Sequence, residues 1–286
     1  MITRRLLASG LLAAPVLAHA TTPRIAVAGG GVAEMLCALG LEGRICGVDS
    51  TALHPTRLRA LPQLGYQRAL SAEGVLSLRP DMLVHAHEAG PPSVLAQLRA
   101  AGLPLIGVPR VTDAEGLIAA ITALGETLGA DPDPVVAAMA ADFAALDTML
   151  PSGPPPRALF LLSAGNGAPQ ASGRGTAAAA MFRLARIRNV IEGYEGYRPL
   201  SPEAALTLGA DWLVAPQHSV EARGGPSAFL AQPQLALLPA ARAGRLYTQD
   251  SLYLLGFGPR SAHAARDMAS ALRGVPLPPL PERPWL

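Results

Sequence analysis

The sequence predicts an α/β protein with two Rossmann-like lobes, each built on a parallel-rich sheet and joined by a single long rigid helix. Short apolar segments of strand length alternate with helix-length segments in both halves of the chain, which favours parallel sheets covered on both faces. In addition, the segment 71–84 recurs without a gap at 201–214. A repeat of such long period implies two similar lobes, and two lobes imply a cleft between them.

The repeat matches in residue type as well as in pattern. A serine, a glutamate, an aspartate and several aliphatic residues return in the same order: Ser71, Glu73, Leu76, Leu78, Asp81, Leu83 and Val84 become Ser201, Glu203, Leu206, Leu208, Asp211, Leu213 and Val214. Before each copy stands a glycine-tyrosine pair, Gly65-Tyr66 and Gly196-Tyr197. Each copy predicts a short helix, a turn at the aspartate and a buried strand.

The start of the chain, 1–20, predicts a secretory signal peptide. Arg4 and Arg5 give a positive start, residues 6–17 are apolar, and Ala18-His19-Ala20 forms an A-x-A cleavage site. The adjacent arginines fit twin-arginine export as well as ordinary Sec export, and both alternatives stay open. No lipidated cysteine follows the cleavage site, and no later run is long and apolar enough to span a membrane. We therefore expect a soluble protein of the periplasm.

The remaining residues divide into an N-terminal lobe at 21–130, a linker helix at 131–152 and a C-terminal lobe at 153–286. Half of the chain is apolar and 15% is charged, which indicates a well-filled globular protein. The net charge of +2 is not clustered, so nucleic acid is not an expected partner, and we expect a monomer. An oxidising compartment permits a disulfide between Cys37 and Cys46, and two buried free thiols are the alternative.

The N-terminal lobe opens with the strand 24–28, the turn Gly29-Gly30-Gly31 and a helix that ends at Gly40. This order suggests a dinucleotide-binding turn, but Glu34 stands where the fingerprint requires its third glycine, and we reject that interpretation. Further helices and strands follow, with strands at 45–48, 82–85 and 105–108 and helices at 72–78 and 93–101. Because ligands bind beyond the carboxyl ends of parallel strands, residues 86–92 and 109–112 are expected to line the cleft.

The linker begins at Asp131-Pro132-Asp133-Pro134, where an aspartate cap and a proline at the first helical position form a strong helix start. Val135 to Leu150 then carries apolar residues at helical spacing, and the proline-rich segment 151–156 ends the helix. A long helix between the lobes predicts a stiff pair with a small hinge motion.

The C-terminal lobe starts with the strand 158–162 and the glycine-rich loop 163–167. Arg174 then stands before the helix 177–186, and an arginine beside a helix N-terminus is suited to bind an anion. The second copy of the repeat, the strand 245–248 and a last helix at 261–273 complete the lobe.

Three motifs resemble a known family: the segment 65–74 (Gly-Tyr-Gln-Arg-Ala-Leu-Ser-Ala-Glu-Gly), the segment 88–92 (Glu-Ala-Gly-Pro-Pro) and the segment 255–260 (Leu-Gly-Phe-Gly-Pro-Arg). The chain resembles the class III periplasmic substrate-binding proteins, whose lobes are joined by a rigid helix and which serve ABC importers of cobalamin, siderophores and haem. It is most similar to the haem-binding members, and the likeness covers essentially the whole mature chain. The resemblance implies a carrier with no catalytic activity.

The resemblance implies that Tyr66 is the axial ligand of ferric haem. A phenolate is a hard anionic oxygen donor that suits Fe(III), and tyrosine is an established haem ligand. Because free tyrosine has a pKa of about 10, ionisation near neutral pH needs the iron and a nearby cation. Arg68 would supply this cation, or else pair with a haem propionate. The alternative for Tyr66 is a half-buried loop tyrosine that packs against the sheet edge.

Further residues are expected around the haem. Some relatives add a histidine ligand in the loop after the first strand of the C-terminal lobe, and this chain has none there. Tyr197 is a candidate for the sixth ligand, although a role in lining the porphyrin is favoured. Arg174 and Arg260 are candidates for the propionates, which suit the bidentate arginine fork, and a surface charge or a structural ion pair is the alternative for each.

Glu73 and Glu203 form the matched acidic pair of the repeat, each at the start of a helix, one in each lobe. In the resembled class such glutamates dock against arginines of the inner-membrane ABC permease, which works with its ATPase. Stabilisation of the helix N-terminus, worth about 0.3–1 kcal/mol, is the alternative for each glutamate alone.

Two other functions stay open. The first is transport of a siderophore or of cobalamin within the same class. The second is an exported metal-dependent α/β enzyme, because His85 and His87 alternate along a strand and Glu88 follows them, which is a possible metal-binding arrangement. No further ligand stands at a suitable spacing, since His54 and His218 are remote in the sequence.

Overall fold

The structure is a computed structural model that describes residues 22–162 and 168–285. The N-terminal lobe contains a four-stranded sheet in the order β2-β1-β3-β4, in which all neighbouring pairs are parallel. The strands are β1 (Ile25–Ala28), β2 (Ile45–Val48), β3 (Met82–Ala86) and β4 (Leu105–Val108). The helices of this lobe are α1 (Gly30–Ala38), α2 (Ala72–Ser77), α3 (Pro92–Ala100) and α4 (Ala114–Leu128), with the short 3₁₀ helices η1 (Glu42–Arg44), η2 (Thr56–Ala60) and η3 (Gln67–Ala69).

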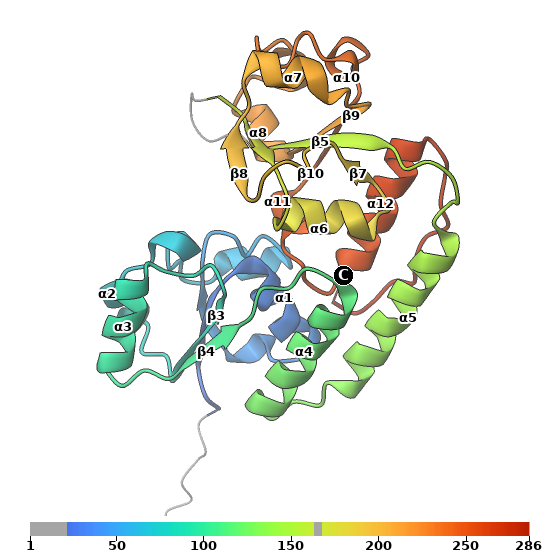
Figure 1. Ribbon diagram of the computed structural model, residues 1–286. Coiled ribbons are helices and arrows are strands. Elements are labelled where there is room, and N and C mark those ends of the chain that lie inside the picture. The colour runs from blue at the N-terminus through green and yellow to red at the C-terminus, as the bar shows by residue number, and fades with distance from the viewer. Residues whose placement is uncertain (1–21, 163–167, 286) are drawn as a thin grey trace, which may run out of the picture.

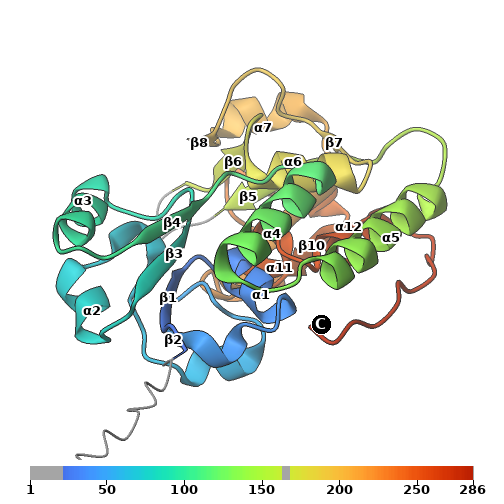
Figure 2. The same ribbon diagram turned by 90° about the horizontal axis from the view of Figure 1, so that it is seen from below.

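Helices cover both faces of this sheet, as Figure 2 shows. Val27 and Val84 belong to the core that α1 and α4 complete, whereas Ala26 and Leu83 belong to the core under α2 and α3. Consecutive residues enter opposite cores because strand side chains alternate between the two faces. The predicted parallel sheet with two covered faces is thereby confirmed.

One long helix, α5 (Asp133–Met149), runs from the N-terminal lobe to the C-terminal lobe (Figure 1). The side chain of Asp131 accepts the Asp133 amide at 3.0 Å and so starts the helix. Met139 lies in the core of the first lobe, and Leu146 lies in a core of the second. Because this helix contributes to the cores of both lobes, it packs into the fold along its length and is not a loose tether.

The C-terminal lobe has a mixed sheet in the order β10-β9-β5-β6-β8, and β7 also pairs with β5. Its strands are β5 (Arg157–Leu162), β6 (Gln170–Ser172), β7 (Arg188–Asn189), β8 (Tyr197–Pro199), β9 (Trp212–Pro216) and β10 (Leu246–Gln249). β6 pairs antiparallel with both β5 and β8, and the other pairs are parallel. The helices are α6 (Ala177–Leu184), α7 (Pro202–Leu208), α8 (Gln217–Glu221), α9 (Pro226–Leu230), α10 (Pro239–Arg242), α11 (Ser251–Leu255) and α12 (Ser261–Arg273).

The sequence repeat forms the same structure in both lobes. Ser71 caps α2 by accepting the Gly74 amide at 2.8 Å, and Ser201 caps α7 by accepting the Ala204 amide at 3.1 Å. The strand after each helix then lies parallel to the first strand of its lobe, β3 beside β1 and β9 beside β5.

The aspartate of the repeat ties each pair of strands together. Asp81 accepts the Arg24 amide at 2.6 Å, while the Arg24 guanidinium donates to the last turn of α2 at the Leu78 carbonyl. In the other lobe Asp211 accepts the Arg157 amide at 3.3 Å, and Arg157 donates to the Leu208 carbonyl. The repeated residues therefore serve the fold at equivalent positions.

Two regions singled out in the sequence, the signal peptide at 1–20 and the glycine-rich loop 163–167, lie outside the described residues. Among the described helices, none is long and apolar enough to cross a membrane. Cys37 and Cys46 are both half-buried free thiols, so the structure shows no disulfide between them. Burial raises the pKa of the Cys37 thiol to about 12, with the neighbouring Glu42 carboxylate acting in the same direction.

Candidate functional site

The loop between β2 and α2 presents Tyr66 and Arg68 to solvent. The Tyr66 side chain is 44% exposed, and its residue stands at the start of η3. The Arg68 guanidinium carbon lies 6.0 Å from the centre of the Tyr66 ring, within the range of a cation–π contact. A large aromatic side chain exposed beside a cation needs an explanation other than packing of the core.

The motif at 88–92 holds this loop from the other side. The Leu70 amide donates to the Gly90 carbonyl at 2.9 Å, and the Gly90 amide donates to the Gln67 carbonyl at 2.8 Å. Two of the three motifs that carry the resemblance are therefore one structural unit. The second motif shapes the backbone on which Tyr66 stands.

Tyr197 belongs to β8 of the other lobe and is half-buried. Burial raises the pKa of the Tyr197 hydroxyl, while the neighbouring Ala178 amide, the Thr176 and Ser172 hydroxyls and the charge of Arg68 act in the opposite direction. Tyr197 and the Tyr66 loop thus belong to opposite lobes.

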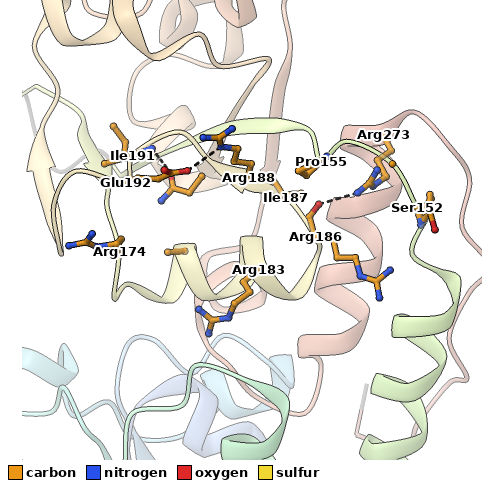
Figure 3. Close-up of a pocket in the computed structure, with 14 residues that line it drawn as sticks. Ser152, Pro155, Arg174, Arg183, Arg186, Ile187, Arg188, Ile191, Glu192 and Arg273 are labelled. Carbon is orange, nitrogen blue, oxygen red and sulfur yellow. Dashed lines mark hydrogen bonds and ion pairs between the residues drawn. The ribbon is translucent and has the colours of Figure 1, made fainter.

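Arg174 follows β6 and points toward solvent beside Glu195, at 4.0 Å between the charged atoms. It lines a pocket of about 540 Å³ on the C-terminal lobe (Figure 3). The pocket also has four further arginines in its lining, Arg183, Arg186, Arg188 and Arg273. Neither Tyr66 nor Arg68 lines it, so this pocket is not the predicted haem site.

The arginines of this pocket are held by the protein. Arg186 donates to the Leu150 carbonyl at 3.1 Å and pairs with Asp147, and Arg188 donates to Glu192 at 3.1 Å. Figure 3 shows guanidinium groups that point in different directions and do not converge on one centre. We therefore assign the pocket no ligand.

Arg260 lies between the lobes, in the last of the three motifs. It forms a buried ion pair with Glu34 of α1, and its guanidinium carbon lies 5.0 Å from the centre of the Tyr253 ring. Glu34 is only 5% exposed. The structure thus places Arg260 in the structural ion pair, one of the two alternatives to propionate binding.

A model of the family described as periplasmic binding protein matches residues 25–253, which is most of the chain. The chain belongs to the periplasmic binding protein family. The two-lobed fold is that of class III periplasmic binding proteins, as predicted, and this family consists of binding proteins rather than enzymes.

Solved structures similar to this periplasmic binding protein agree over nearly their whole length. The apo form of the periplasmic haem-binding protein RhuT from Roseiflexus sp. RS-1 is 37% identical, with a TM-score of 0.84, over 88% of this chain and 98% of that one. The haem-binding protein BhuT in complex with two haems is 37% identical, with a TM-score of 0.82 and the same coverage of both chains. A periplasmic haem-binding protein from Pseudomonas aeruginosa is 34% identical, with a TM-score of 0.80, over 90% of this chain and 95% of that one. A search of curated proteins finds no match.

In this binding protein Glu73 and Glu203 occupy the second position of α2 and α7, and both are exposed. The neighbouring Glu203 backbone amide and Ser201 hydroxyl lower the pKa of the Glu203 carboxyl. The two glutamates therefore have the same local position in the two lobes.

His85 in β3 and His87 beyond its end do not meet as a pair of metal ligands. His85 is buried, and its Nδ1 lies 2.9 Å from the Ala86 carbonyl oxygen, whereas His87 is exposed in the turn beyond the strand. The strand ends at Ala86, so the alternation that would align both rings does not continue to His87. Within residues 22–162 and 168–285, no group of three or more histidine, cysteine or acidic residues could hold a metal ion.

Sequence reasoning did not foresee the contacts between the lobes or the burial of Asp49, which is 1% exposed. Arg110 donates to the Gly175 carbonyl at 3.0 Å, and Arg183 donates to the Thr112 carbonyl at 2.7 Å. These bonds join residues that lie far apart in the chain, so no local pattern reports them. Asp49, in contrast, has a local signal in the sequence. It is a polar residue directly after a predicted strand, where ligands or turns are expected.

Proposed function

We propose that this periplasmic binding protein captures haem between its lobes and delivers it to an inner-membrane ABC permease with its ATPase. Support comes from haem-binding relatives that are 34–37% identical over nearly their whole length. The observation that carries the proposal in this chain is the exposed Tyr66 with Arg68 beside it.

The proposed chemistry assigns Tyr66 as the axial ligand of ferric haem, the transported cargo. Coordination to Fe(III) needs the phenolate, and both the iron and a nearby positive charge favour that form. Arg68 is the cation at this place, and in the bound state it would stabilise either the phenolate or a propionate.

The C-terminal lobe would supply the other wall. We assign Tyr197 to lining the porphyrin, since it is half-buried on β8 of the C-terminal lobe. Arg174 is the propionate candidate that remains, because its side chain is 61% exposed and its ion pair with Glu195 is 4.0 Å long. Arg260 is not assigned to haem in this proposal, because it is engaged with Glu34.

The proposal is tested by titration of the purified protein with hemin. We expect a Soret band and a high-spin Fe(III)–phenolate spectrum in the wild type, and loss of the phenolate signature in Tyr66→Phe. Affinity should fall about 100-fold or more, because even the loss of an outer-shell partner costs a metal site about 10–100-fold. Tyr194→Phe removes a hydroxyl from the other lobe that donates to the Ala171 carbonyl and serves as the control. Unchanged hemin binding in Tyr66→Phe would reject Tyr66 as the iron ligand. Tighter binding of cobalamin or a ferric siderophore than of hemin would reject haem as the cargo.

We also propose that Glu73 and Glu203 dock on the permease, one on each half. Their equivalent, exposed positions in two lobes support this, because the stabilisation of one helix N-terminus gives no reason for a matched pair. Charge pairs at the edge of an interface act mainly on recognition and association rate.

The double variant Glu73→Ala with Glu203→Ala is therefore expected to lose stimulation of the transporter's ATPase in proteoliposomes while binding hemin as the wild type does. Glu115→Ala is a matched control, because Glu115 is an exposed glutamate at the same position of α4. ATPase stimulation that survives in the double variant would rule out the docking role.

A further inference from the structure

Asp49 stands directly after β2 and is 1% exposed. Its Oδ1 accepts the Gly29 amide at 2.7 Å and the Thr51 hydroxyl at 3.0 Å. Its Oδ2 accepts the Thr51 amide at 3.0 Å and the Gln67 amide at 3.2 Å. An ionised carboxylate offers about four lone-pair positions, and here all of them are used.

The four donors come from three segments of the chain. Gly29 belongs to the glycine turn between β1 and α1, Thr51 follows Asp49 itself, and Gln67 follows Tyr66 directly. One buried charge therefore ties the carboxyl ends of two neighbouring strands to the loop that carries the exposed tyrosine. Hydrogen bonds to a charged group are stronger than those between neutral groups.

Other bonds fix the same loop on both sides of Tyr66. The Ser50 amide donates to the Gly65 carbonyl at 2.8 Å, just before the tyrosine. The Thr51 hydroxyl also accepts the Gly30 amide at 2.8 Å, which connects the glycine turn to this network a second time. The turn itself has no room to shift, because a Cβ on Gly29 would lie 2.6 Å from the Cβ of Ala86.

We propose that Asp49 is a positioning residue for Tyr66, and that its carboxylate sets the place of the phenolic oxygen through the Gln67 amide. The inference rests on the proposed haem function. A ligand supported by a hydrogen-bonded outer shell holds its orientation toward a metal, and the loss of such support weakens the site. Asparagine cannot reproduce these bonds, because its NH2 group would face two of the four hydrogen-bond donors.

The sharpest test removes the Gln67 amide hydrogen and controls for the loss of the side chain. Gln67→Pro does this at the first position of η3, where the fixed φ of proline is tolerated. Tyr66 has φ −87° and ψ 134°, the extended conformation that a residue before proline prefers. Gln67→Ala is the matched control, because it removes the same side chain and keeps the amide. We expect hemin affinity to fall about tenfold or more in Gln67→Pro and to stay within about twofold in Gln67→Ala, given the cost of losing a bond to a charged group.

Asp49→Asn is the second test, paired with Asp142→Asn. Asp142 is a carboxylate of α5 that is 2% exposed and accepts the Arg283 guanidinium at 3.1 Å. Both variants are expected to lower the melting temperature. At saturating hemin, only Asp49→Asn should shift or weaken the Fe(III)–phenolate charge-transfer band, which a loss of stability alone would leave in place.

The outcomes separate the two proposals. If the wild type shows a phenolate band that depends on Tyr66, but Gln67→Pro and Asp49→Asn keep that band and the wild-type affinity, the role of Asp49 is wrong and haem binding stands. If the wild type binds hemin but has no band that depends on Tyr66, both the ligand assignment and the role of Asp49 fail. If the wild type does not bind hemin, the proposed function itself fails.

Discussion

Arg79 has a left-handed backbone conformation, which residues other than glycine rarely adopt. It follows Leu78, the C-cap of α2, with φ +48°, which lies in the left-handed region. The equivalent position in the second lobe is Gly209, the C-cap of α7, with φ +55°. The same helix end is therefore made with glycine in one lobe and with an exposed arginine in the other. The left-handed conformation costs a non-glycine residue about 1–2 kcal/mol.

Replacement of this arginine by glycine should stabilise the protein. The strain that Arg79→Gly removes exceeds the extra chain entropy of glycine, about 0.5–1 kcal/mol, so we expect a gain of up to about 1 kcal/mol in the free energy of unfolding. Arg79→Ala is the control, because it removes the side chain and keeps the strain. Chemical denaturation of the three proteins measures the effect, and an equal gain in both variants would mean that the side chain, not the backbone, is the cause.

For single residues of the site, the sequence identified candidates more readily than it identified the partners that they contact. Tyr66 and Arg68 lie together because they are two positions apart on one loop, which a sequence displays directly. Arg260 pairs with Glu34, a partner 226 positions away in the chain, so a motif can mark it but cannot reveal its contact. Charge and motif therefore identify candidate residues, and the fold decides which of them are free to bind.

At the scale of elements, caps and periodicity predicted several of the longer helices, but the sequence analysis missed α4 and the short helices α8 to α11. The last helix is found at Ser261–Arg273, and α5 spans Asp133–Met149 within the predicted linker 131–152. The helix α4 also carries its signals, an Asp113 cap and a left-handed Gly129 at its end, and could have been predicted from them. The short strands β6 and β8 could not, because strands of three residues have no periodicity to detect. They make the second sheet mixed, and β8 is the strand that carries Tyr197.

At the scale of the whole molecule, the lobes meet through a buried charge pair close to tightly packed glycines. Glu34 of α1 faces Arg260, and a Cβ on Gly258 would lie 2.3 Å from the Glu34 carboxylate. A Cβ on Gly31 would lie 2.0 Å from the Gly256 carbonyl oxygen. Removal of one partner from such a pair is costly, because it leaves an uncompensated charge in the interior. The segment 255–260 that marked the family in the sequence is thus a contact between lobes.

The Glu34–Arg260 pair predicts that the stability of the protein depends on pH. Burial raises the pKa of Glu34 to about 7, against the lowering effect of Arg260 and with a smaller raising effect from Asp250. A carboxyl group with a higher pKa in the folded than in the unfolded protein binds its proton more tightly when folded. Its contribution to stability is therefore full below about pH 4.5 and is lost as the pH rises through about 7.

In Glu34→Gln this titration is absent. The amide oxygen can still accept both Arg260 bonds, because these converge on one oxygen of Glu34. We therefore expect the free energy of unfolding of the wild type, relative to Glu34→Gln, to fall by about 1–3 kcal/mol between about pH 5 and pH 8, since one pKa unit corresponds to about 1.4 kcal/mol. Denaturant titrations of both proteins across this range measure the difference. A difference that stays constant or grows with pH would show that Arg260 keeps Glu34 ionised, and that the contact between the lobes is an ion pair at every pH.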